Sequence, residues 1–80
     1  MMTSKEVKAL LKPLVEEVLK SSGTRLSIVQ IAHEIWRKHE HDLRHDERLF
    51  LTWQYEMRWA ADTLKDEGKL DKNREGWLWL

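Results

Sequence analysis

Hydrophobic residues recur at helical spacing along the first part of the chain. The pattern Thr3-Ser4-Lys5-Glu6 has the form of a capping box, in which Thr3 and Glu6 bond each other's backbone N–H groups. Apolar residues then fall on one helical face, at Val7, Leu10, Leu11, Leu14, Val15, Val18 and Leu19. Gly23 is a suitable stop for this first predicted helix.

Pro13 interrupts this first helical pattern on its polar side. A proline removes one backbone hydrogen bond and crowds the preceding turn, but it is well suited to a first helical position. Residues 1–12 therefore form either an N-terminal arm or a kinked extension of the first helix. The break is favoured, because Lys12 is pushed towards extended geometry by the proline that follows it.

A second helix is predicted after a short extended segment at Leu26. Ser27 and Gln30 form another capping box. The apolar stripe of this helix follows at Ile28, Ile31, Ala32, Ile35 and Trp36. The stripe fades near Lys38 or His39, and the polar, histidine-rich residues 39–48 are predicted to form a loop.

The third predicted helix starts near Thr52, a possible N-cap, and ends at Gly68. With Met57 at the centre of its buried face, four further residues lie within about 60° of that centre, namely Trp53, Ala60, Ala61 and Leu64. The opposite face carries Tyr55, Trp59, Asp62 and Asp66.

The chain ends in a pattern typical of a β-hairpin. A short strand near residues 69–71 is followed by a polar run and then by the alternating segment 76–80, Gly-Trp-Leu-Trp-Leu. The alternation puts Trp77 and Trp79 on one face of the strand, and which face closes the core stays open. Three helices followed by a C-terminal antiparallel hairpin predict an α+β fold, a winged helix-turn-helix formed by residues 1–80 as a single domain.

Composition narrows the possible functions. Fourteen basic and fourteen acidic residues cancel, which weakens the case for tight nucleic-acid binding, and there is no cysteine for a disulfide or a thiolate metal site. No signal peptide or membrane-spanning run is present, so we expect a cytoplasmic protein with no membrane partner. No nucleophile motif or phosphate-binding glycine loop occurs, so we expect neither catalysis nor a cofactor. The histidines His33, His39, His41 and His45 lack a closed ligand set, so we expect no metal.

The third helix and the hairpin loop carry side chains suited to double-stranded DNA. Arginine and glutamine read base edges, and tyrosine and arginine also contact phosphates and sugars. The candidate DNA-binding residues are Thr52, Gln54, Tyr55 and Arg58 on the helix and Lys72, Asn73 and Arg74 in the loop. Glu56, Asp62 and Asp66 argue against this interpretation, because they would repel phosphates. The alternative is a protein-interaction or self-associating domain that uses Trp59, Trp77 or Trp79 as anchors.

The segment from Tyr55 to Leu70 resembles the N-terminal winged-helix domain of Mrr-like restriction proteins. That family carries a Trp-Ala dipeptide, a following leucine, a Gly-Leu-Leu-like turn and a wing that ends in Gly-x-Trp-x-Ile/Leu. The loosely matching residues here are Trp59-Ala60, Leu64, Gly68-x-Leu70 and Gly76-Trp77-Leu78-Trp79-Leu80, with Lys12-Pro13-Leu14-Val15 and Leu26-Ser27-Ile28 near the starts of the first two helices. Over residues 12–80, the resemblance implies a winged helix and DNA recognition attached to a nuclease. No nuclease domain follows the wing in this sequence, so we expect a DNA-binding module, regulatory or related to a restriction system.

Overall fold

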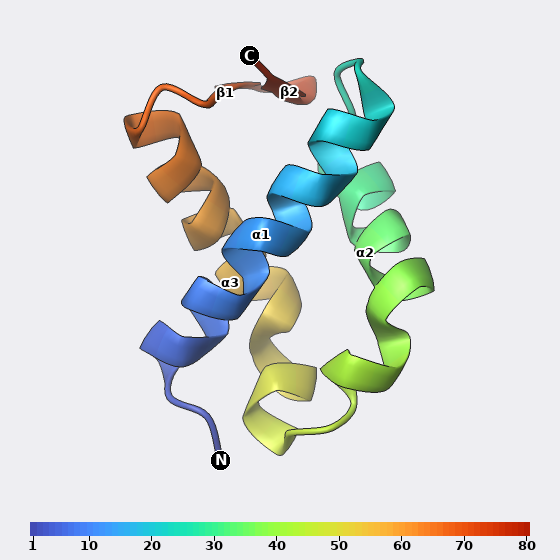
Figure 1. The fold of residues 1–80 in the computed structure, drawn as a ribbon, viewed down its shortest axis with the longest axis vertical. Helices are drawn as coiled ribbons and strands as arrows, with labels where there is room; N and C mark the ends of the chain where they lie inside the picture. Colours follow the sequence, from blue (N-terminus) through green and yellow to red (C-terminus); the bar gives the residue numbers. More distant parts are fainter.

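The computed structural model describes all 80 residues, which form three helices followed by an antiparallel hairpin (Figure 1). The elements are α1 (Ser4–Ser22), α2 (Ile28–Leu43), α3 (Glu47–Asp66), β1 (Leu70–Asn73) and β2 (Gly76–Trp79). The two chain termini lie at opposite ends of the longest axis. This α+β layout confirms the predicted order of elements and is consistent with a winged helix. No helix combines the length and the apolar composition that crossing a membrane requires.

Helix α1 begins at its capping box and runs through Pro13 without ending. The Thr3 side chain accepts from the Glu6 N–H at 3.2 Å, the Glu6 carboxylate accepts from the Thr3 N–H at 2.9 Å, and Gly23 ends the helix at φ 66°. The predicted break before Pro13 is wrong. Pro13 lies on the exposed side of the helix, as does Ala9, whose carbonyl loses its donor. Water can reach that carbonyl, so the helix continues past the proline.

Helices α2 and α3 both extend into the segment predicted as a loop. Helix α2 passes His39, which has non-helical backbone angles of φ −129° and ψ 19°, and continues to Leu43. Helix α3 begins five residues before Thr52, with Asp46 as its N-cap. The Thr52 hydroxyl instead donates to the Arg48 carbonyl at 2.6 Å. The prediction of a loop over residues 39–48 and of Thr52 as the N-cap is therefore wrong.

Aromatic packing explains why this polar segment is helical. The Arg44 guanidinium lies over the rings of Trp36 and Phe50, 4.9 Å and 5.4 Å from their centroids. Trp36 in turn stacks on the buried Trp53, with centroids 6.0 Å apart. Leu43 is fully buried in the hydrophobic core. Burial of Leu43 and packing of the Arg44 side chain on the aromatic rings thus stabilise the segment 39–48, whose other residues are polar.

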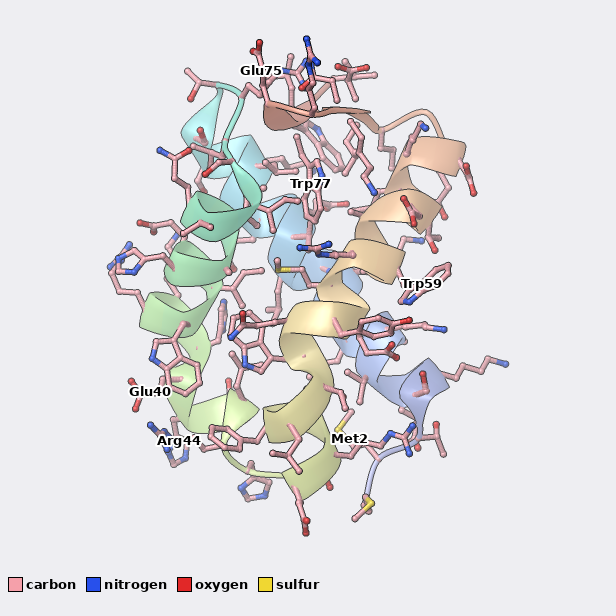
Figure 2. All side chains as sticks on the ribbon, turned by 180° about the vertical axis from the view of Figure 1, so that it is seen from behind. Met2, Glu40, Arg44, Trp59, Glu75 and Trp77 are labelled. Atoms are coloured by element: carbon pink, nitrogen blue, oxygen red, sulfur yellow. The ribbon has the colours of Figure 1, made fainter.

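The core lies where α1 crosses α2 and α3 (Figure 1). The five residues predicted for the inner face of α3 are all buried. Of the apolar faces predicted for the first two helices, Leu10 is exposed and Leu14, Ile28, Ala32 and Trp36 are partly buried, while the other residues are buried. Trp77 of β2 is 1% exposed and completes the core below the hairpin (Figure 2). Trp79, on the same strand face, is partly buried against the core, whereas Leu80 is exposed. The tryptophan face of β2 is therefore the inner one.

The hairpin is fastened to the segment between α1 and α2. Strands β1 and β2 pair antiparallel, with Leu70 opposite Trp79 and Asn73 opposite Gly76. The short extended segment predicted at Leu26 adds an isolated bridge, in which the N–H groups of Leu26 and Trp77 donate to each other's carbonyls at 3.0 Å and 2.9 Å. A third strand segment thus joins the wing to the helices.

Gly76 fits this bridge because it has no side chain. Its φ is 141°, and an added Cβ would lie 1.9 Å from the Leu26 carbonyl oxygen. We therefore expect Gly76→Ala to lower the free energy of unfolding by about 3 kcal/mol or more, through backbone strain and overpacking. Gly23→Ala is the matched control, because φ is also positive there but the space is open, and it should cost only about 1–2 kcal/mol. Urea denaturation of both variants measures the difference, and equal losses would contradict the close approach at Leu26.

The Asp46 carboxyl makes the stability of the folded protein decrease at acid pH. Hydrogen bonds from the Leu49 and Met2 backbone N–H groups hold the pKa of this carboxyl below its ordinary value. A carboxyl whose pKa is lower in the folded state contributes stability above its ordinary pKa, and this contribution is lost as pH falls through the folded value. Asp46→Asn keeps a good N-cap but removes the titration. The melting temperature of the variant should therefore fall less than that of the parent protein between about pH 4 and pH 2, and parallel curves would be evidence against this role.

Candidate functional site

One face of α3 is left uncovered by the rest of the fold. Figure 2 shows α3 on the near side of the molecule, with α2 beside it and Trp59 projecting away from α2. We call this surface the outer face of α3. It comprises Arg48, Leu51, Thr52, Tyr55, Arg58, Trp59, Asp62 and Asp66.

Three large apolar side chains are exposed on the outer face at intervals of four residues. Leu51 is 69% exposed, Tyr55 63% and Trp59 47%. The rings of Tyr55 and Trp59 meet edge to face with centroids 6.4 Å apart, and the Lys8 ammonium of α1 lies 5.2 Å from the Trp59 centroid. Side chains at i, i+4 and i+8 form a ridge on a helix, which is the feature that packs into a groove of another surface.

The arginines divide into two groups by their partners. Three of the six are ion-paired with a carboxylate within the fold: Arg25 with Asp71, Arg37 with Glu34, and Arg44 with Glu40. The other three make no ion pair and are exposed: Arg48 and Arg58 on the outer face of α3 and Arg74 at the turn of the hairpin. The arginines free to meet an external anion are thus on α3 and the wing.

Two of the three acidic residues of α3 that were expected to repel phosphate are engaged elsewhere. Glu56 is 4% exposed and accepts a hydrogen bond from the Ser4 hydroxyl, so it faces α1. Asp62 is ion-paired with Lys72. Asp66 alone is exposed and makes no ion pair. The burial of Glu56 could not be predicted from the sequence, because a glutamate beside the core face is ordinarily solvated.

The predicted wing residues differ in their surroundings. The Lys72 ammonium contacts Asp62 and lies 5.3 Å from the Trp77 ring centroid, so it joins the wing to α3. The Asn73 side-chain oxygen accepts from the N–H groups of Glu75 and Gly76 at 2.8 Å and 3.2 Å. Asn73 therefore shapes the turn, and Arg74 is the cation displayed at its tip.

Gln54 lies between two shallow hollows where the N-terminal half of α2 meets α3. One hollow is lined by Val29, Ala32, His33, Trp36, Trp53 and Gln54, and the other by Ile28, Gln54, Tyr55, Met57 and Arg58. The structure thus brings Gln54, Tyr55 and Arg58 together, as predicted from their helical spacing. Arg48 and Leu51 also lie on α3, before the predicted helix start at Thr52, and so were not among the predicted residues.

The predicted tryptophan anchors are not equivalent. Trp77 is almost completely buried in the core, and Trp79 is half-buried with the Lys20 ammonium 5.2 Å from its ring centroid. Trp59 is the tryptophan on the exposed face of α3. Any contact with a partner through tryptophan would therefore use Trp59 first.

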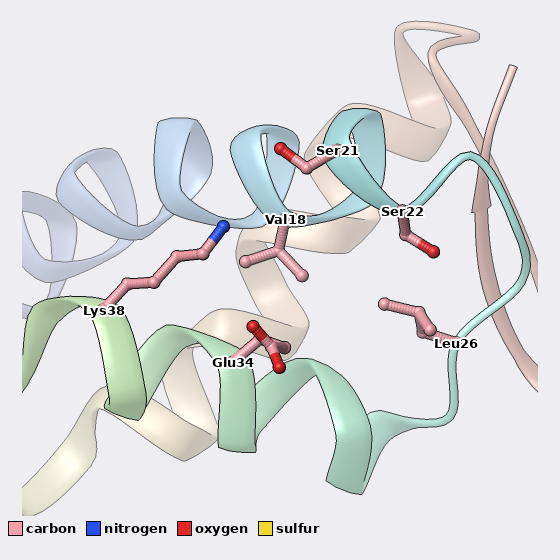
Figure 3. A pocket seen from close by; sticks show the side chains of 6 residues that line it. All are labelled: Val18, Ser21, Ser22, Leu26, Glu34 and Lys38. Atoms are coloured by element: carbon pink, nitrogen blue, oxygen red, sulfur yellow. The ribbon is translucent and has the colours of Figure 1, made fainter.

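A further hollow lies between the C-terminal part of α1 and α2 (Figure 3). It is lined by Val18, Ser21, Ser22, Leu26, Glu34 and Lys38. Glu34 is held by Arg37, and the Ser22 hydroxyl by Thr24. No three histidine, aspartate or glutamate side chains anywhere in the chain gather as a metal-ligand set, and His39 contacts Glu17 at 3.1 Å.

No family model matches the chain, and no curated protein or solved structure does either.

The contact between Ser4 and Glu56 fixes α1 against α3, and its loss should be costly. Ser4→Ala leaves the nearly buried Glu56 carboxylate without its donor, which should lower the free energy of unfolding by about 1–3 kcal/mol. Glu56→Gln keeps an acceptor of the same size for the Ser4 hydroxyl, so its cost should be smaller. Chemical denaturation of the two variants provides the comparison. If Ser4→Ala left the free energy of unfolding unchanged, the Glu56 carboxylate would have to be solvated by water instead.

Proposed function

We propose that this chain is a non-enzymatic module that binds double-stranded DNA through the outer face of α3 and the turn of the wing. The observation that carries the proposal is the placement of the unpaired arginines. Arg48, Arg58 and Arg74 have no carboxylate partner, and all three lie on these two elements. Arginine without an internal partner is available to phosphate oxygens and to guanine edges.

In the proposed complex α3 enters the major groove, which is about 12 Å wide and admits a helix. Gln54 and Arg58 lie on the flank of α3 towards α2 and would face base edges. Arg48 near the N-terminus of α3 and Arg74 at the wing turn would hold phosphates on either side. Tyr55 and Thr52 would add contacts to the sugar-phosphate backbone.

The zero net charge does not oppose this proposal once internal partners are considered. Glu56 is turned towards α1 and Asp62 is neutralised by Lys72, so neither presents an unpaired charge to a phosphate. Glu67, at the end of α3, is likewise paired with Lys12 and Lys69. Asp66 is the carboxylate of the outer face that has no ion-pair partner, against the two unpaired arginines Arg48 and Arg58, so the unpaired charge on this face is positive.

The resemblance to Mrr-like N-terminal domains supports the same function, since that family implies DNA recognition. We propose a relationship to these domains and a cytoplasmic setting, where a DNA-binding module of a regulator or restriction-related system would act.

A second candidate function is protein binding by the same face. The exposed ridge of Leu51, Tyr55 and Trp59 favours it, because aromatic side chains are enriched at the centres of interfaces.

Fluorescence anisotropy with a labelled duplex at low salt tests the DNA proposal. Arg58→Ala should weaken binding by about 1–3 kcal/mol if it reads a base, and Arg74→Ala should reduce the salt dependence by about one phosphate contact. Arg37→Ala is the matched control, because it removes the same charge from an arginine already paired with Glu34. No binding by the parent protein at low salt, or equal losses in all three variants, would refute the proposed interface.

A further inference from the structure

Four residues of the outer face of α3, two charged and two aromatic, are placed symmetrically about its middle. Arg48 and Asp66 are eighteen residues apart, which is five turns at about 3.6 residues per turn, so they lie on one line along the helix. Tyr55 and Trp59 lie between them, two residues before and two residues after Met57. The face therefore reads cation, aromatic, aromatic, anion along the helix, with equal spacing on either side of Met57.

This order of side chains is complementary to the same order read in the opposite direction along a second helix. When two copies of α3 lie antiparallel and are related by a two-fold axis at the level of Met57, each residue meets the one equally far on the other side of that axis. Arg48 of one copy then faces Asp66 of the second copy, and Tyr55 faces Trp59 of the second copy. Each contact occurs twice, as in any two-fold interface.

We propose that a second copy of this chain covers the outer face of α3 in this antiparallel arrangement. The charges support a second copy as the occupant, because Arg48 and Asp66 are exposed, make no ion pair within the fold, and have opposite sign. The aromatic pair supplies apolar area at the centre, where interfaces are least charged. This proposal names the partner for the second candidate function.

No like charges oppose one another across this arrangement. Asp62 lies about 40° to one side of the line through Arg48 and Asp66, and it is already neutralised by Lys72. Arg58 lies on the flank towards α2, away from the two-fold axis, and lines the hollow next to Ile28. The reverse pairing, with parallel helices, would place Arg48 against Arg48 and Asp66 against Asp66 and is therefore disfavoured.

The interface is confined to one helix face, so self-association should be weak. Stable interfaces bury at least about 1,200 Å², and one helix pair contributes less than this, so the dimer should form and dissociate as concentration changes. The dimer covers Arg48 and Tyr55 and occupies the face of α3 proposed to enter the major groove, so dimerisation and DNA binding would exclude each other. This competition rests on the proposed function, whereas the dimer itself does not.

Sedimentation equilibrium without DNA tests the dimer, over protein concentrations from about 10 μM to about 1 mM, the range of a weak complex. The parent protein should pass from monomer to dimer. Arg48→Asp and Asp66→Arg should each raise the dissociation constant about tenfold or more, because each puts two like-charge pairs into the symmetric interface. The double variant Arg48→Asp/Asp66→Arg should restore dimerisation, since it exchanges the charges and keeps their complementarity.

Two further variants sharpen this test. Trp59→Ala should also raise the dissociation constant, through loss of the central aromatic pair. Arg37→Asp, a charge reversal away from the outer face, should leave it unchanged. A parent protein that stays monomeric at the highest concentration would overturn the proposal, as would a double variant no better than either single one. Neither result depends on whether DNA binds.

Discussion

The backbone pairing between Leu26 and Trp77 determines how the rest of this small structure is arranged. It joins the segment between α1 and α2 to the last strand, and it fixes the Trp77 ring in the core below the hairpin. Gly76 permits the close approach, and Arg25 reinforces it by donating to the Gly76 carbonyl at 3.0 Å and pairing with Asp71. Burying one tryptophan removes about 150–250 Å² from water, and the core of this eighty-residue chain contains only sixteen buried hydrophobic residues.

The position of the hairpin determines which side chains stay exposed and without an internal partner. With the hairpin held over the end of the helices, Lys72 reaches Asp62 and Asn73 closes the turn, so Arg74 is the cation presented at the tip. Helix α1 covers one side of α3, where the Ser4 hydroxyl donates a hydrogen bond to the Glu56 carboxylate. What stays uncovered is a ridge of two aromatic residues and a leucine, flanked by unpaired arginines. This surface carries both the proposed DNA contacts and the proposed contacts with a second copy, so the two proposed interactions would compete.

Local patterns in the sequence predicted most of the fold. The two capping boxes, the buried face centred on Met57 and the order of helices and hairpin are properties of short segments, and the structure confirms them. The errors arose where tertiary contacts override local preference. The segment 39–48 contains mostly polar residues, yet packing of Arg44 on Trp36 and burial of Leu43 make most of it helical. Pro13 is tolerated because its side of α1 faces solvent.

The candidate site was predictable only in part, for the same reason. Helical spacing was enough to bring Gln54, Tyr55 and Arg58 together. The partners of Glu56, Lys72 and Asp62 lie far along the chain or on another element, so their pairing could not be predicted from spacing. Arg48 was missed because the start of α3 depends on the Asp46 cap and on contacts with Met2 at the N-terminus.

The most direct test of the central claim, that the outer face of α3 is the working surface, is an NMR map of backbone amide shifts. One sample is titrated with a short DNA duplex at low salt, and a second, without DNA, is diluted stepwise. In both series the shifts should include Arg48 and Tyr55. The DNA series should add Gln54, Arg58 and Arg74, and the dilution series should add Trp59 and Asp66. Shifts confined to the exposed sides of α1 and α2, or no shifts in either series, would contradict the account.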